Sequence, residues 1–230
     1  MEDGDLESIE RPESLARRAY SALRKAIRDR SLEPETLYSE LQLAAELNIS
    51  RTPVREALIE LSREGIIDVV PQRGFRVRRI AEAEEREVFD LRGAIETYVV
   101  RRLAAQATES DVGELRGILE RQGQVPGDAA AFLELDESFH LTMPALMGLN
   151  RTREMLGTLR GIIFLTGSMA LAVPQRTDEV LAEHRQILDC IAAREPDRAA
   201  RAIMNHLERT YQHSRSLDWA QHLPDRRSAS

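Results

Sequence analysis

The stretch from residue 37 to residue 77 constrains the fold most, because it carries closely spaced signals for two helices and a hairpin. Ser39, followed three residues later by Gln42, is typical of a helix that starts with a capping box. Ser50 can cap a second helix, and Gly65 is suited to end it. Two short apolar runs, which we expect to be strands, then flank a turn that contains proline and glycine. The pattern predicts a helix–turn–helix with a two-stranded β-wing.

The second of these helices suggests a use, because Arg51, Thr52 and Arg55 all fall near its start. In helix–turn–helix proteins the N-terminal residues of the second helix enter the major groove. Arginine matches O6 and N7 of guanine with two donors, and threonine reaches a base edge or a phosphate. Arg73 lies in the wing turn and three more arginines follow, where they can meet phosphates or the minor groove. The alternative is an ordinary helical hairpin with a solvated basic face.

The formal net charge of −7 is unevenly distributed along the chain. Residues 11–80 contain 14 basic and 10 acidic side chains, whereas residues 81–230 contain 18 basic and 24 acidic ones. The local field, rather than the total charge, steers a nucleic acid toward a protein. The mildly basic first part of the chain is therefore compatible with DNA binding.

Cysteine usage and hydropathy indicate the compartment. Cys190 is the only cysteine, so no intrachain disulfide can form, which suits a reducing cytoplasm. The acidic first ten residues lack the basic-then-apolar pattern of a signal peptide. No apolar run approaches the roughly 18 residues of a membrane span. We therefore expect a cytoplasmic protein.

Helical periodicity dominates the chain beyond residue 80, where the sequence contains no credible strand. We expect about six helices there, at residues 82–107, 110–122, 128–146, 150–172, 177–193 and 196–217. The predicted fold class is mostly α, with an N-terminal winged helix–turn–helix and a C-terminal all-α helical bundle. The expected parts are a disordered N-terminus (1–12), a winged helix–turn–helix domain (13–79), a helical domain (80–220) and a flexible tail (221–230).

A second group of residues in the helical part points to metal chemistry. Asp136 and His140 are four residues apart, so they share one face of a helix. His184 and His206 fall inside the last two predicted helices. Bundle cores build metal sites from facing helices, and this donor set suits Zn²⁺, Ni²⁺, Fe²⁺ or Mn²⁺. For each histidine alone, the alternative is a hydrogen-bonded core or surface side chain.

The N-terminal part resembles the DNA-binding domain of the GntR family of bacterial transcription regulators. The runs that carry this resemblance are Ser50–Leu58, Glu64-Gly65 and Pro71–Gly74. The resemblance implies that DNA is contacted by Arg51, Thr52, Arg55 and Gly74, with Ser50 nearby. Leu41 is a departure that bears on the operator, because some FadR-type members have arginine at the corresponding position.

The helical part resembles the FCD ligand domain that follows the GntR module in FadR-subfamily regulators. The runs that carry this resemblance are Asp136–His140, Glu183–Arg185 and Asn205–Leu207. It implies that the metal ligands are Asp136, His140, His184 and His206. A domain of six helices resembles the VanR-like branch of this subfamily. The fatty-acyl branch lacks the metal quartet, which argues against an acyl-CoA effector. Effector binding and dimerisation are then expected in residues 80–220.

Members of the resembled subfamily commonly bind small organic acids, whose carboxylate can complete the coordination of the metal. Arg92, on the first bundle helix, is our candidate for a further effector-binding residue, because guanidinium pairs bidentately with carboxylate. The alternative is a salt bridge within the protein, for example with Glu96 four residues later.

The prediction is a homodimeric repressor that binds a pseudo-palindromic operator and responds to a small carboxylate effector. The alternative from another class is a helical metalloenzyme with an accessory helix–turn–helix. Glu137-x-x-His140 is half of a di-iron carboxylate pattern, but no second Glu-x-x-His occurs. No zinc-protease motif, phosphate loop or nucleophile elbow is present either, so no catalytic residue is predicted. A third possibility is a purely structural metal ion.

Overall fold

The winged helix–turn–helix lies in the first of two compact units into which the chain divides, residues 1–62 with 67–77 and residues 63–66 with 78–230. The computed structural model describes residues 13–29, 31–171 and 175–216. The predicted disordered N-terminus and flexible tail lie outside the described residues.

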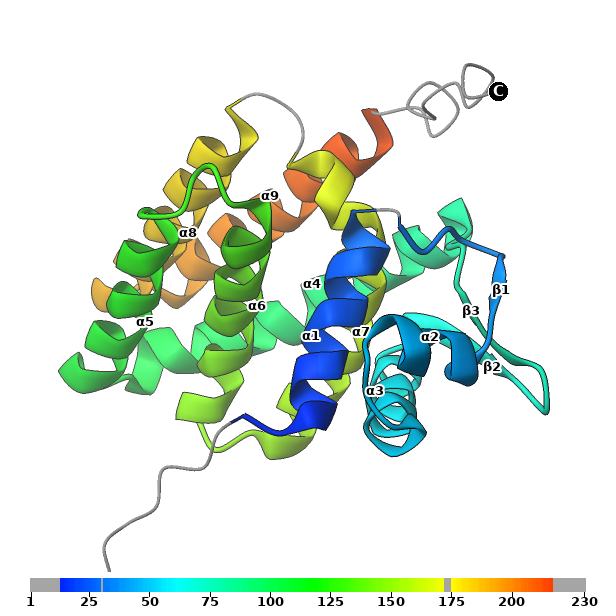
Figure 1. The fold of residues 1–230 in the computed structure, drawn as a ribbon. Coiled ribbons are helices and arrows are strands. Elements are labelled where there is room, and N and C mark those ends of the chain that lie inside the picture. Colours follow the sequence, from blue (N-terminus) through cyan, green and yellow to red (C-terminus); the bar gives the residue numbers. More distant parts are fainter. Residues whose placement is uncertain (1–12, 30, 172–174, 217–230) are drawn as a thin grey trace, which may run out of the picture. The chain divides into compact units, whose positions relative to one another are not determined.

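The N-terminal unit combines three helices with a small antiparallel sheet (Figure 1). The helices are α1 (Leu15–Arg28), α2 (Glu40–Glu46) and α3 (Arg51–Arg63). The strands are β1 (Leu37–Tyr38), β2 (Ile67–Val70) and β3 (Gly74–Val77). They pair in the order β1-β3-β2. The wing hairpin was predicted, but β1 was not: a strand of two residues has no readable periodicity, and it exists only because it pairs with distant β3.

Local signals explain where these helices begin and end. The hydroxyl of Ser39 accepts a hydrogen bond from the backbone N–H of Gln42 at 3.1 Å, which starts α2 as predicted. The same hydroxyl donates a hydrogen bond to Oε1 of Gln42 at 3.2 Å. Gly65 follows α3 with a φ of +71°, a conformation that glycine adopts without steric cost. The buried face of α3 includes Val54 and Leu61.

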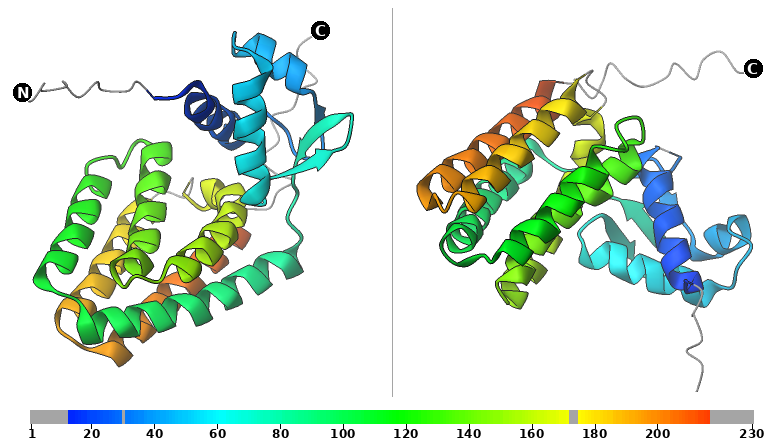
Figure 2. Two further views of the ribbon diagram at one scale, coloured as in Figure 1. Left: turned by 90° about the horizontal axis from the view of Figure 1, so that it is seen from below. Right: turned by 90° about the vertical axis from the view of Figure 1, so that its left-hand side faces the viewer.

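The C-terminal unit has six helices among its described residues (Figure 1). They are α4 (Glu82–Gln106), α5 (Glu109–Gln122), α6 (Ala129–Leu146), α7 (Asn150–Ala170), α8 (Arg176–Ala192) and α9 (Pro196–Ser216). Helix α4 contacts α6, α7, α8 and α9, so it is the central helix of the bundle. Figure 2 shows α8 and α9 running side by side. One apolar core, built from all six helices, surrounds the buried polar residues discussed below.

Two helices of this unit begin one residue earlier than predicted. Helix α5 begins at Glu109 rather than at residue 110, because Thr108 and Asp111 form a reciprocal capping box just before it. Helix α8 begins at Arg176, one residue before the predicted start, and follows Gln175 at a left-handed φ of +71°. No described side chain caps α8. Within the described residues, no helix is both long enough and apolar enough to span a membrane.

Candidate metal centre and nucleic-acid interface

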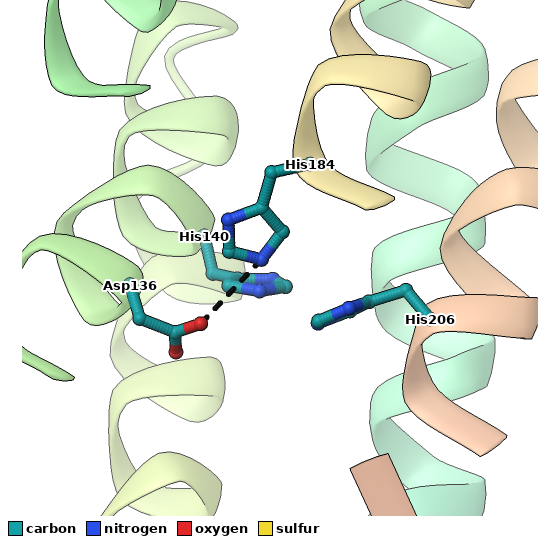
Figure 3. A group of neighbouring side chains, drawn as sticks. All are labelled: Asp136, His140, His184 and His206. Carbon is teal, nitrogen blue, oxygen red and sulfur yellow. Dashed lines mark ion pairs between the residues drawn. The ribbon is translucent and has the colours of Figure 1, made fainter. Parts of the chain in front are cut away.

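The four predicted metal ligands come together in the core of the helical bundle. Asp136 and His140 project from α6, His184 from α8 and His206 from α9 (Figure 3). One potential ligand atom from each residue lies within 4.8 Å of those from the other three. The histidines are buried, and Nε2 of His184 is 3.4 Å from Oδ1 of Asp136. An imidazole-rich set with one carboxylate suits a divalent transition metal.

A separate oxygen acceptor holds the Nδ1 atom of each imidazole. His140 contacts Glu96 of α4, His184 contacts Gln122 of α5 at 3.0 Å, and His206 contacts Glu183 of α8 at 2.8 Å. An ionised carboxylate or an amide oxygen can only accept, so each of these contacts places a proton on Nδ1 and makes Nε2 the ring nitrogen that could bind a metal. Metal-ligating histidines are oriented in this way. The residues present therefore fit a metal ion bound through Nε2.

Arginines in turn hold the two carboxylates that contact the histidines, Glu96 and Glu183. Glu183 accepts from Arg176 at 2.9 and 3.2 Å and pairs with Arg209 at 2.7 Å. Burial alone would raise the pKa of Glu183, but hydrogen bonds from His206 and Arg176 outweigh it and lower that pKa to about 2. Glu183 is therefore ionised at neutral pH, and it supplies a fixed negative charge behind His206.

The predicted effector residue Arg92 is buried and lies one contact away from the quartet. Its Nε donates to Oε1 of Glu96 at 2.7 Å, while Oε2 of Glu96 contacts His140. The salt bridge with Glu96 that the sequence suggested is thus present. The role of Arg92 toward an effector stays a prediction.

Sequence reasoning missed Gln122 and Glu183 as partners of the histidines, and considered Glu96 only as a partner of Arg92. The glutamate in Glu183-His184 carries little signal, because adjacent helical residues point in different directions. Gln122 is the last residue of α5 and reaches His184 only through helix packing. Tertiary structure was needed to find all three acceptors.

Most of the predicted DNA contacts meet around one hollow in the N-terminal unit. This hollow, of about 390 Å³, lies between α2, α3 and the wing turn. Four predicted residues line it, namely Arg51, Arg55, Arg73 and Gly74. Ser50 and Thr52 are exposed but do not line it. Leu41, which departs from the resembled pattern, is 66% exposed and also lines the hollow.

Glu40 is a lining residue that the sequence did not single out. Its carboxylate accepts from Arg55 at 2.9 and 3.2 Å and from Arg51 at 3.4 Å. The hydrogen bond from Arg55 is the main reason why the pKa of Glu40 is lowered. The same bond raises the pKa of Arg55.

Gly74 has a structural requirement besides its predicted DNA contact. Its φ is +131°, which L side chains rarely adopt. A Cβ at this position would overlap the carbonyl oxygen of Tyr38 and lie 3.0 Å from its carbonyl carbon. The close pairing of β1 with β3 therefore depends on glycine here.

A winged helix–turn–helix followed by a helical bundle that contains an Asp–His cluster defines a DNA-binding transcription regulator. The bacterial regulatory proteins of the gntR family match residues 15–77, and the FCD domain matches residues 87–209. The chain belongs to the GntR family and carries an FCD domain, as the sequence resemblance implied. This membership decides against the metalloenzyme alternative.

Relatives and solved structures agree with this assignment. An HTH-type transcriptional regulator in an unstable DNA locus of Streptomyces ambofaciens is 33% identical over 84% of this chain and 81% of its own length. The transcriptional repressor RspR of Escherichia coli is 30% identical over 87% and 91%. A structure of E. coli McbR/YncC is similar with a TM-score of 0.72 at 22% identity, covering 87% of this chain and 99% of its own. At that identity the structural likeness shows the fold alone.

Proposed function

We propose that this protein is a repressor whose affinity for its operator is controlled by a small organic acid bound beside a metal ion. The observation that carries the proposal is the convergence of one aspartate and three histidines within 4.8 Å. Each of these histidines has an acceptor for its Nδ1 atom, so Nε2 is the ring nitrogen through which each would bind a metal.

Asp136, His140, His184 and His206 would hold the ion, a divalent transition metal such as Zn²⁺, Ni²⁺, Fe²⁺ or Mn²⁺. When bound, such an ion supplies open coordination positions that a carboxylate oxygen can take. The chain's own contribution is to fix the imidazole orientations and to exclude water, because the three histidines are buried.

Arg92 is our proposed second anchor for the effector's carboxylate. Its Nε donates to Glu96 at 2.7 Å, and the same Glu96 carboxylate also contacts His140. A guanidinium has five N–H donors, so Arg92 has donors other than the Nε–H that Glu96 accepts. An effector at Arg92 would thereby be felt at His140 through one carboxylate.

At the DNA end, we propose that a homodimer presents two copies of α3 to a pseudo-palindromic operator in the cytoplasm. Arg51, Arg55 and Arg73 line one hollow, which supports a shared DNA-facing surface. Two relatives support repression: RspR of E. coli is named a repressor, and a 31% identical Paenarthrobacter nicotinovorans protein a probable D-xylose utilization operon repressor.

The test measures whether carboxylates change DNA affinity through the metal site. An operator is first selected from random duplex DNA with the full-length protein. Its affinity is then measured by fluorescence anisotropy with metal-loaded protein and a panel of small mono- and dicarboxylic acids. We expect at least one acid to weaken operator binding by about 5- to 150-fold, the usual range of allosteric coupling.

Two variants make this test specific. His184→Ala removes a proposed ligand and should abolish the response, whereas His213→Ala should keep it, because His213 contacts the Arg209 carbonyl and lies outside the quartet. A response of equal size in His184→Ala would contradict effector control at the metal. If removal of the metal lowers the stability of the protein but leaves operator binding unchanged, the ion is purely structural.

A further inference from the structure

Glu40 lies at the start of α2 and faces the two arginines that we propose as base contacts. Its carboxylate accepts from Nε and Nη2 of Arg55 through the same oxygen, Oε2, at 3.2 and 2.9 Å. The Glu40 side chain is 26% exposed, whereas both arginine side chains are 58% exposed. All three residues line the hollow between α2, α3 and the wing.

The contact occupies one particular edge of the Arg55 guanidinium. Nε and Nη2 form its side edge, which Glu40 takes. The distal edge, with Nη1 and the outer hydrogen of Nη2, points away from this carboxylate. A guanine needs two parallel donors from a guanidinium held in a fixed plane. Glu40 therefore fixes the plane of Arg55 without using the edge that suits a base.

The same carboxylate also changes the charge of the surface. The hydrogen bond from Arg55 lowers the pKa of Glu40, so Glu40 stays ionised at neutral pH. A negative charge beside Arg51 and Arg55 weakens their attraction for any phosphate backbone. Because backbone attraction dominates sequence-independent binding, this charge should cost non-specific affinity more than specific affinity.

We propose that Glu40 is a specificity-determining positioning residue, which orients Arg55 for base reading and suppresses binding to arbitrary DNA. This inference rests on the proposed role of Arg55 as a base reader. The role proposed for Glu40 is indirect. As an anion, Glu40 is not expected to contact phosphate, so it would act on DNA only through Arg55.

The test compares full-length wild type with Glu40→Gln, Glu40→Asp and Glu46→Gln. Glu46 is the matched control, because it is an exposed glutamate at the other end of the same helix. A site is selected from random duplex DNA with the wild type. The affinity of each protein for this site and for a scrambled duplex is measured at fixed salt, and circular dichroism checks folding.

We expect Glu40→Gln to bind scrambled DNA more tightly and to lower the ratio of specific to scrambled affinity by about tenfold, within the range of one bidentate base contact. Glu40→Asp keeps the charge but shortens the side chain, so its ratio should fall while its scrambled affinity stays unchanged. Glu46→Gln should leave the ratio within about twofold.

Two results would overturn the inference. One is an unchanged ratio in both Glu40 variants. The other is an equal gain on both duplexes in Glu40→Gln, which would make Glu40 a source of repulsion only. Failure of the proposed function looks different: the wild type would select no sequence, or a folded Arg55→Ala would keep the wild-type ratio.

Discussion

Glu183 is not one of the four predicted metal ligands, but its carboxylate contacts one of them, His206. It accepts from His206, Arg176 and Arg209, and its side chain is only 5% exposed. Removing one charge from a buried network leaves its partners uncompensated. Glu183→Gln should therefore lower the free energy of unfolding of the metal-free protein by about 3 kcal/mol, measured by urea denaturation.

Glu179 provides the control for this prediction. It contacts the same two arginines, Arg176 at 3.0 Å and Arg209 at 2.8 Å, but its side chain is 39% exposed. Exposed ion pairs contribute little, so Glu179→Gln should cost less than about 1 kcal/mol. Equal losses in the two variants would mean that burial does not set the strength of this network.

Gly74 leads to a prediction about stability rather than DNA contact. Gly74→Ala would place a Cβ against Tyr38 at a φ of +131°, and strain of this kind costs about 2 kcal/mol. Thermal unfolding should show this loss in the absence of DNA. As a comparison, a Cβ added at Gly113 in α5 would meet nothing within 4 Å, so Gly113→Ala should stabilise by about 0.5–1 kcal/mol.

A Gly74→Ala protein that unfolds like the wild type but no longer binds DNA would contradict the structural requirement. That outcome would leave the predicted backbone contact with DNA as the reason for glycine.

The residues of the site were unequally predictable. Asp136 and His140 could be paired from sequence, because a spacing of four places two side chains on one helix face. Their approach to His184 and His206 was suggested by family resemblance, and the structure brings the four together. Glu96 and Gln122 occupy helix positions that look ordinary in sequence, and only packing gives them a histidine partner.

At the scale of elements, the start of α5 gives a direct test of helix capping. The predicted helix begins at residue 110, but the structure places the cap at Thr108, because Asp111 completes its capping box. Thr108→Ala should reduce the free energy of unfolding by about 1 kcal/mol. Ser110→Ala lies inside the helix and should change it by less than about 0.5 kcal/mol, since alanine has the higher helix propensity. The reverse order in chemical denaturation would refute this assignment.

Helices were predictable as elements because their signals are local. All six expected helices of the C-terminal unit are present among the described residues, with ends close to those predicted. Predictions failed where a distant partner or an unusual backbone conformation determines the local structure, as in β1, which needs β3 as a partner. The start of α8 is another case, because Gln175 adopts a left-handed conformation that glutamine rarely takes.

At the scale of the whole molecule, effector and operator must influence each other equally. If a carboxylate weakens operator binding by some factor, the operator must weaken carboxylate binding by the same factor. Isothermal titration of metal-loaded protein with the carboxylate, with and without operator duplex, should return the factor found by anisotropy. Unequal factors would mean that the acid does not weaken operator binding by binding to this protein.

The proposed metal centre is tested most directly by the metal content of the purified full-length protein after loading. We predict a single metal ion per chain in the wild type and in His213→Ala, and its loss in both His140→Ala and His184→Ala. A wild type that holds no metal after loading, or a His184→Ala protein that keeps the full amount, would contradict the proposed metal centre.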